Sequence, residues 1–403
     1  MSRPTRMAFG RYDFAAYQSF VAYAGSTVVI PVALVSLAHD LGFSLEEGGM
    51  ASGGALQIGR TTTVTATIIL GGFIVGRWGK RRSMGYAVAL MGVGVLLAAV
   101  APVYGTLLLA LMVAGLGEGV LEGLLTPFVR DLHPDEPGRY INITHSFWPF
   151  GVLVTVLASG ALLSLGVSWR LVVGGVGVLA FVAVFMFLLP ERKGREYPEH
   201  PEPVHWRTTW EHVKQIGRVR RFWVFFAAMF VAGGGEFCLT FWVASYIQLN
   251  FGEAAWAGGV GTAMFAGGMV VGRIGGGYVV RQHQLKRLIV GSAVVGTAVT
   301  FFIPAVTDLT GLFGVLFVAG LATAPYWPSV QSYSADRMPR SDTTMLFILL
   351  SCAGVPGCGV LAWVMGLIGD AAGLRTAFYL VPACYLVLAI LIAWEGRRPV
   401  ATS

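Results

Sequence analysis

Residues 71–82 read Gly-Gly-Phe-Ile-Val-Gly-Arg-Trp-Gly-Lys-Arg-Arg. An apolar run ends at Arg77, three more basic residues follow by position 82, and a second apolar run starts at residue 83. A helix needs about 20 mostly apolar residues to cross a bilayer, and Lys and Arg gather in the short loops on one side. The stretch therefore predicts two membrane helices joined by a tight basic loop.

The same alternation continues along the whole chain of 403 residues. Of these residues 55% are hydrophobic and 12% are charged, which is about half the charged fraction usual in soluble domains. A soluble core of this length could not cover so much apolar surface, so we expect an all-α polytopic membrane protein with twelve transmembrane helices. The expected spans are 14–38, 49–76, 83–102, 106–130, 144–166, 169–190, 222–249, 254–280, 286–305, 309–334, 343–369 and 374–395.

The basic residues predict the orientation. If both termini are cytoplasmic, all but four of the 28 Lys and Arg residues fall on the cytoplasmic side, which is the positive-inside pattern. This segregation accounts for the net charge of +7 without a nucleic-acid partner. We expect a multi-pass protein of a bacterial inner (plasma) membrane. The four exceptions are Arg60, Arg170, Arg273 and Arg375.

One long polar stretch divides the chain near its midpoint. It holds three prolines and then an amphipathic segment, 206–216, which we expect to lie as a helix on the membrane surface. The expected organisation is an N-terminal six-helix half at 1–190, a cytoplasmic linker at 191–221 and a C-terminal six-helix half at 222–403.

The two halves repeat at an offset of 205 residues. An even number of spans per half gives both halves the same orientation, as in a parallel repeat about an axis along the membrane normal. A solute site is then expected between the halves near the middle of the bilayer. The matching pairs are 71–75 with 276–280, Pro134 with Pro339, and Trp169-Arg170 with Leu374-Arg375.

Residues 72–82 resemble the signature loop of the major facilitator superfamily, which lies between spans two and three. That loop usually carries Asp before the Arg, where this chain has Gly76. The glycine spacing and the basic cluster remain, and with twelve spans and the repeat the resemblance covers the whole chain. It implies a transporter fold with a conformational loop formed by Gly72, Arg77, Gly79, Lys80 and Arg81.

Three further stretches stand out: Leu121-Glu122 with Pro127-Phe128-Val129, 141–147 with Phe150-Gly151, and Gly235-Glu236 with Trp242 and Tyr246. They resemble the corresponding spans of the fucose permease and its sugar–proton symporter relatives. This narrower resemblance implies a monosaccharide-like substrate, with Glu122 as proton carrier. The chain departs from that group in the first span, where Thr27 stands in place of an acidic residue.

Five ionisable residues fall inside predicted spans, where charge is costly and therefore indicates function. Glu118 and Glu122 are four residues apart on one helix face, and two neighbouring carboxylates in low dielectric do not both ionise easily. One of them could carry a proton, with Arg60 offsetting the other. Alternatively, Arg60 and Glu118 form a fixed pair that only holds helices together. Glu236 is open between a substrate contact and a structural pair, and Arg273 is expected to reach the cytoplasmic interface.

Uncharged groups could hold the solute, because binding pockets combine apolar walls with a few polar donors and acceptors. Pro325 and Pro328 could open the tenth predicted span toward a cavity. For each aromatic residue, packing against lipid or helices is the alternative, and His145 could equally be a neutral packing residue. With Glu236, the substrate-binding candidates are Gln57, Asn142, His145, Trp148, Trp242, Tyr246, Tyr326, Trp327 and Gln331.

Motifs of other protein classes are missing from the sequence. Residues 115–119 look superficially like a nucleotide loop, but they lie in an apolar span without a Gly-Lys-Ser/Thr ending. No catalytic motif occurs and the four cysteines show no metal spacing, so we expect no enzyme activity, no cofactor and no metal. Three functions stay open for a monomer that handles a small solute and protons: proton-coupled uptake, proton-antiport export of metabolites or drugs, and facilitated uniport.

Overall fold

The computed structural model describes residues 8–135, 137–191, 196–198, 206–279 and 282–397. Within these ranges the regular structure is helical throughout. Before the linker lie α1 (Arg11–Asp40), α2 (Met50–Ala99), α3 (Tyr104–Leu132), α4 (Pro137–Ser164) and α5 (Trp169–Leu188). After it lie α7 (Arg220–Phe251), α8 (Ala255–Val279), α9 (Leu285–Phe301), α10 (Leu309–Thr323), α11 (Tyr326–Arg337), α12 (Thr343–Ala372), α13 (Leu374–Ala377) and α14 (Leu380–Glu395).

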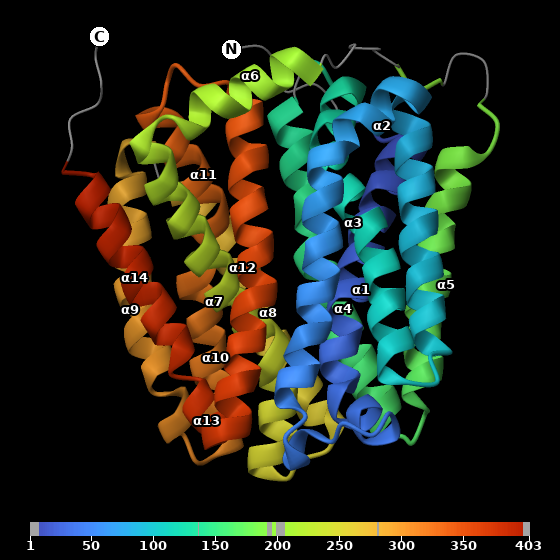
Figure 1. The fold of residues 1–403 in the computed structure, drawn as a ribbon, viewed down its shortest axis with the longest axis vertical. Helices are drawn as coiled ribbons and strands as arrows, with labels where there is room; N and C mark the ends of the chain where they lie inside the picture. The colour runs from blue at the N-terminus through green and yellow to red at the C-terminus, as the bar shows by residue number, and fades with distance from the viewer. Residues whose placement is uncertain (1–7, 136, 192–195, 199–205, 280–281, 398–403) are drawn as a thin grey trace.

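These helices form two groups that stand side by side (Figure 1). The N-group is α1–α5 and the C-group is α7–α14. Helix α6 (Trp206–Gly217) lies across the end where both termini are found, which we call the linker face; the other end is the opposite face. The groups meet where α2 packs on α12, α4 on α8 and α1 on α7.

The predicted membrane architecture is confirmed, with differences at three spans. Eleven segments of the described chain are long and apolar enough to cross a bilayer. The predicted spans 49–76 and 83–102 are the two arms of α2, which bends at Gly79. The first arm is not among the eleven apolar segments. Gly79 has φ 76° and ψ 163°, a conformation that is essentially restricted to glycine. The tenth span breaks between α10 and α11 at Pro325, and the twelfth between α13 and α14.

Near the opposite face the two groups touch backbone to backbone, because glycines stand at the contacts. A methyl group on Gly359 of α12 would lie 2.1 Å from Thr61 Oγ1 and 3.1 Å from Ile58 Cα in α2. On the other side of the interface, a methyl group on Gly259 of α8 would lie 2.4 Å from the Val156 carbonyl oxygen in α4. Small residues allow helices in a membrane to approach this closely. The structure is therefore closed at its opposite face.

A carboxylate reinforces this closure. Helix α2 follows Gly49, which has no side chain to cap its first turn, and Asp370 of α12 supplies the cap from the other group. Its Oδ1 accepts a hydrogen bond from the Met50 N–H at 2.8 Å and its Oδ2 accepts one from the Ala51 N–H at 2.8 Å. These bonds join helices of different groups, so they must break if the opposite face opens.

We expect Asp370→Ala to favour opening of the opposite face. Loss of an N-cap costs about 1 kcal/mol, which is roughly a fivefold change in the ratio of closed to open molecules. The measurement is the distance between spin labels at the exposed residues Glu46 and Ala254, with a longer-distance population growing in the variant. The control is Asp308→Ala, since Asp308 caps its own helix α10 through the Gly311 N–H at 2.6 Å. Equal distance distributions in both variants would contradict the role of Asp370.

Candidate functional site

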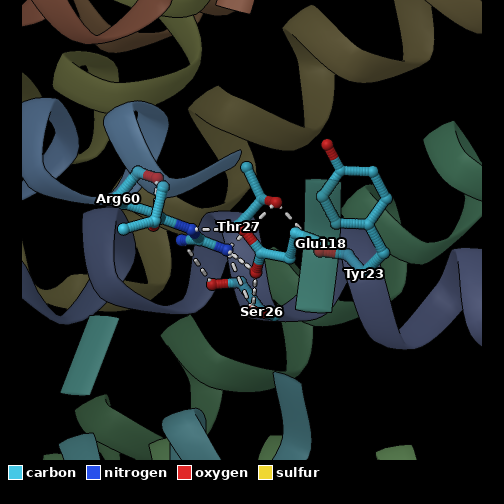
Figure 2. Close-up of polar contacts among 6 residues, drawn as sticks. Tyr23, Ser26, Thr27, Arg60 and Glu118 are labelled. Carbon is cyan, nitrogen blue, oxygen red and sulfur yellow. Dashed lines mark hydrogen bonds and ion pairs between the residues drawn. The ribbon is translucent and has the colours of Figure 1, made fainter. Parts of the chain in front are cut away.

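Arg60 and Glu118 form a buried ion pair between α2 and α3, and α1 encloses it (Figure 2). The Arg60 Nε–H donates to Glu118 Oε2 at 2.8 Å, and its two terminal nitrogens donate to Glu118 Oε1, the Ser26 carbonyl oxygen, Ser26 Oγ and Thr27 Oγ1. Ser26 Oγ donates in turn to Glu118 Oε1 at 2.5 Å. The side chains are 2% and 1% exposed. This geometry fits the alternative of a fixed pair that holds three helices together.

Glu122 lies one turn further along α3 and takes no part in that pair. No described Lys, Arg or His lies within salt-bridge distance of its carboxylate. The Tyr23 hydroxyl of α1 is within hydrogen-bonding reach of Glu122, and no contact joins that hydroxyl to the Arg60–Glu118 pair in Figure 2. Glu122 is partly exposed and lies within electrostatic range of Cys358 in α12. Glu122 therefore lies inside the bundle, near the boundary with the C-group.

Glu236 and Arg273 form a looser pair in the C-group. An Arg273 terminal nitrogen lies 3.4 Å from Glu236 Oε1, and the Arg273 Nε–H donates to the Ala324 carbonyl oxygen at 3.3 Å. Glu236 Oε2 is buried without a hydrogen-bond partner in the described chain. The side chains are 13% and 29% exposed. Arg273 was expected to reach toward the interface; its guanidinium instead contacts Glu236 in the bundle.

His145 joins this region from α4. Its Nε2 lies 2.9 Å from Thr126 Oγ1 of α3, and its ring packs 4.9 Å from the Phe20 ring of α1. It is exposed and lies within electrostatic range of Arg273 across the boundary between the groups. We define the central polar cluster as Tyr23, Glu122, His145, Glu236, Arg273 and Cys358.

Two predicted tryptophans and Gln331 are partly exposed. Trp148 is one turn from His145 and is partly exposed. It packs against one apolar cluster inside the N-group and against a second at the boundary with the C-group. The Trp327 indole lies against Gly354, where a methyl group would be 2.4 Å from the ring, and it is also partly exposed. Gln331 donates weakly to Ser351 Oγ at 3.4 Å. Both indoles are thus only partly covered by their neighbours.

Three other predicted binding aromatics are buried and engaged by their neighbours. Trp242 is 0% exposed and its indole N–H donates to the Ala362 carbonyl oxygen at 2.9 Å. Tyr326 is 0% exposed and its hydroxyl donates to the Ser292 carbonyl oxygen at 3.0 Å. Tyr246 is buried against the rings of Phe251 and Phe378. In this conformation their donors and faces are occupied, so we leave them out of the proposed site.

Two predicted polar residues add little to the site geometry. Gln57 is 6% exposed and lies where α2 meets α12, with its carbonyl oxygen close to Gly359. The side chains of Asn142 and of Arg77 in the predicted conformational loop lie outside the described part of the structure, and the surroundings of Gly72 are outside it as well.

The remainder of that loop is held at the linker face by acids that the sequence analysis did not single out. Lys80 Nζ pairs with Asp131 at 2.6 Å, and Arg81 Nε lies 3.5 Å from Glu191 Oε1. Glu191 also accepts from the Tyr12 hydroxyl at 2.6 Å and the Tyr197 N–H at 2.8 Å. Partial burial alone would raise the pKa of Glu191, but these hydrogen bonds and the charges of Arg81 and Arg11 outweigh it and lower the pKa.

Comparison with known proteins gives one family match. The family model described as Major Facilitator Superfamily matches residues 16–311. No curated protein matches the chain significantly.

Solved structures share the fold at low sequence identity. A bacterial homologue of the human lysosomal transporter Spinster, in an inward-facing and occupied conformation, aligns with TM-score 0.74 and 17% identity over 98% of each chain. The D-xylose–proton symporter aligns with TM-score 0.75 and 13% identity over 95% of this chain and 96% of its own. The E. coli fucose:proton symporter aligns with TM-score 0.64 and 16% identity, over 95% and 98%.

Proposed function

Because the chain belongs to the major facilitator superfamily, we propose that it is a secondary transporter which takes up a sugar or a similar small polar solute together with protons. The family indicates a membrane transporter rather than an enzyme. The proposed uptake works by alternating access, with the halves 1–190 and 222–403 moving about the central polar cluster. We propose that a monomer in the inner membrane does this, with both termini in the cytoplasm.

One observation carries the proton-coupling part of the proposal: Glu122 is an acid at the group boundary without a cation partner. An unpaired carboxylate away from bulk water is costly, whereas the same carboxyl in its protonated form is tolerated. Glu118 differs because Arg60 and Ser26 already satisfy its charge and its oxygens. We therefore assign the transported proton to Glu122 and a structural role to Glu118 and Arg60.

We propose that the central polar cluster, which contains Glu122, forms the solute site together with two neighbouring tryptophans. His145, Arg273 and Glu236 offer hydrogen-bond donors and acceptors, and Trp148 and Trp327 offer accessible aromatic faces. Such a mixture of a few polar groups and apolar walls suits a small polyhydroxylated solute. In the proposed cycle, a proton on Glu122 favours solute binding, and loss of that proton at the other face favours release.

The test uses the purified protein in liposomes with an imposed pH gradient. Uptake of radiolabelled fucose, xylose and galactose is compared between the wild type, Glu122→Gln and the control Glu47→Gln, which alters an exposed acid at the opposite face. We expect Glu122→Gln to lose gradient-driven accumulation at least about tenfold while retaining solute exchange. The amide cannot carry a proton, and one proton moving down one pH unit supplies about 1.4 kcal/mol, which corresponds to about tenfold accumulation.

Other outcomes select the alternatives. Unchanged pH dependence in Glu122→Gln would contradict the proton assignment and leave a uniporter. Movement of a hydrophobic cation against the proton gradient, with no sugar transported, would replace uptake by proton-antiport export.

A further inference from the structure

Arg273 uses only part of its hydrogen-bonding capacity. A guanidinium offers five N–H donors in a planar fork. The Nε–H goes to the Ala324 carbonyl oxygen and one terminal nitrogen to Glu236, at 3.3 and 3.4 Å, and the other terminal nitrogen has no partner among the described residues. With 29% of the side chain exposed, part of the fork is accessible to a ligand.

Glu236 likewise leaves hydrogen-bonding capacity unused. Its Oε1 makes one long contact with Arg273, and its Oε2 is buried with no partner in the described chain. The Arg60–Glu118 pair is the opposite case, since its two side chains share several bonds and both carboxylate oxygens are satisfied. Buried polar groups normally have hydrogen-bond partners. An unpaired carboxylate oxygen beside an arginine with free N–H donors therefore points to a ligand that binds transiently.

The groups around the pair do not supply another cation. Within electrostatic range of Glu236 lie Arg273, Cys358, Tyr326 and Tyr385 from the surrounding helices, and of these only Arg273 is charged. His145 approaches Arg273 from the N-group. A ligand that took Arg273 away from Glu236 would therefore leave that carboxyl without a counter-charge, in a place where an unpaired charge is costly.

We infer that the solute carries a carboxylate, which replaces Glu236 at Arg273 while Glu236 takes up a proton. Arginine binds carboxylates through two parallel N–H···O bonds, which suits an exposed fork better than a single contact at 3.4 Å. The charge at this pair balances, because the negative solute and the proton on Glu236 enter together and the arginine remains paired. The proton on Glu122 is carried in addition, so two protons accompany each solute. His145 and Thr126 lie across the boundary as hydrogen-bonding groups for hydroxyls. The inference rests on the proposed function and narrows its substrate class to sugar acids and related hydroxy acids.

The first test compares two solutes that differ at one carbon. Binding and pH-driven uptake of D-galacturonate and D-galactose are measured with the full-length protein in liposomes. We expect galacturonate to be preferred by about tenfold or more, the usual effect of one charge-assisted pair. Arg273→Gln should abolish this preference, and Arg273→Lys should restore it only in part because lysine lacks the fork. The control is Arg287→Gln, which alters an exposed arginine of α9.

A second variant separates binding from folding. Glu236→Gln removes the competitor for Arg273, so galacturonate should bind about three- to tenfold more tightly and with a flatter pH dependence. A merely structural pair predicts weaker binding or misfolding for this variant. If galactose is carried as well as galacturonate and Arg273→Gln carries both, the inference is wrong while the proposed function stands. If neither solute responds to the pH gradient in the wild type, the proposed function itself fails.

Discussion

Glu118→Gln is expected to lower the stability of the folded protein by about 3–5 kcal/mol, because it leaves the Arg60 charge buried without its partner. Both side chains are almost fully buried, at 2% and 1% exposure, and no other acid is within salt-bridge distance of Arg60 in the described structure. The pair also joins α1, α2 and α3 through Ser26, so the three helices loosen together. The measurement is the melting temperature of the detergent-solubilised protein, together with its recovery as a single species in size-exclusion chromatography.

A double variant distinguishes the loss of a pair from the loss of packing. Arg60→Met with Glu118→Leu removes both charges at similar volume, and such replacements are often neutral or stabilising. We therefore expect it to melt well above Glu118→Gln. Glu122→Gln serves as the comparison in the same helix, and it should melt close to wild type because Glu122 has no cation partner. If Glu118→Gln melts normally and loses proton coupling instead, Glu118 is the proton carrier and our assignment is reversed.

The fold could be predicted from the sequence because the features that identify membrane helices follow one another along the chain. Apolar runs of about 20 residues and the basic segments between them identify helices and loops without reference to neighbours. The differences arise where geometry depends on a single residue. The positive φ of Gly79 lets two predicted spans continue as one bent helix, and Pro325 divides another.

The site was less predictable because spacing along a helix does not fix which neighbour a side chain meets. Glu118 and Glu122 share a helix face, yet one turn separates a saturated ion pair from an unpaired acid. Trp242 and Trp327 read alike as aromatic residues in apolar spans, but one is fully buried and the other is accessible. Tyr23 and Thr126 were missed since hydroxyl groups in apolar spans commonly bond to their own backbone. Asp131 and Glu191 were missed because an acid just beyond a predicted span does not by itself indicate which basic residue it pairs with.

Gly359→Leu is expected to open the opposite face. A methyl group there would already lie 2.1 Å from Thr61 Oγ1, and the Ile58 Cα at 3.1 Å and the Gln57 carbonyl oxygen at 3.2 Å leave no room for a longer side chain. Overpacking of this kind costs about 1–3 kcal/mol, and here it falls on the closed arrangement alone. The ratio of closed to open molecules should therefore fall by about five- to a hundredfold.

Hydrogen–deuterium exchange shows whether this opening occurs. In Gly359→Leu, exchange should rise in residues 50–61 and 359–370, where α2 and α12 separate, and fall at the linker-face ends of the same helices. The control is Gly291→Leu in α9, where an added methyl group meets nothing within 4 Å. Gly359→Ala should lie between the wild type and Gly359→Leu, because it adds the first clash and not the rest. Unchanged exchange in both variants would mean that α2 and α12 can separate elsewhere, and that the close contact at Gly359 does not decide which face is open.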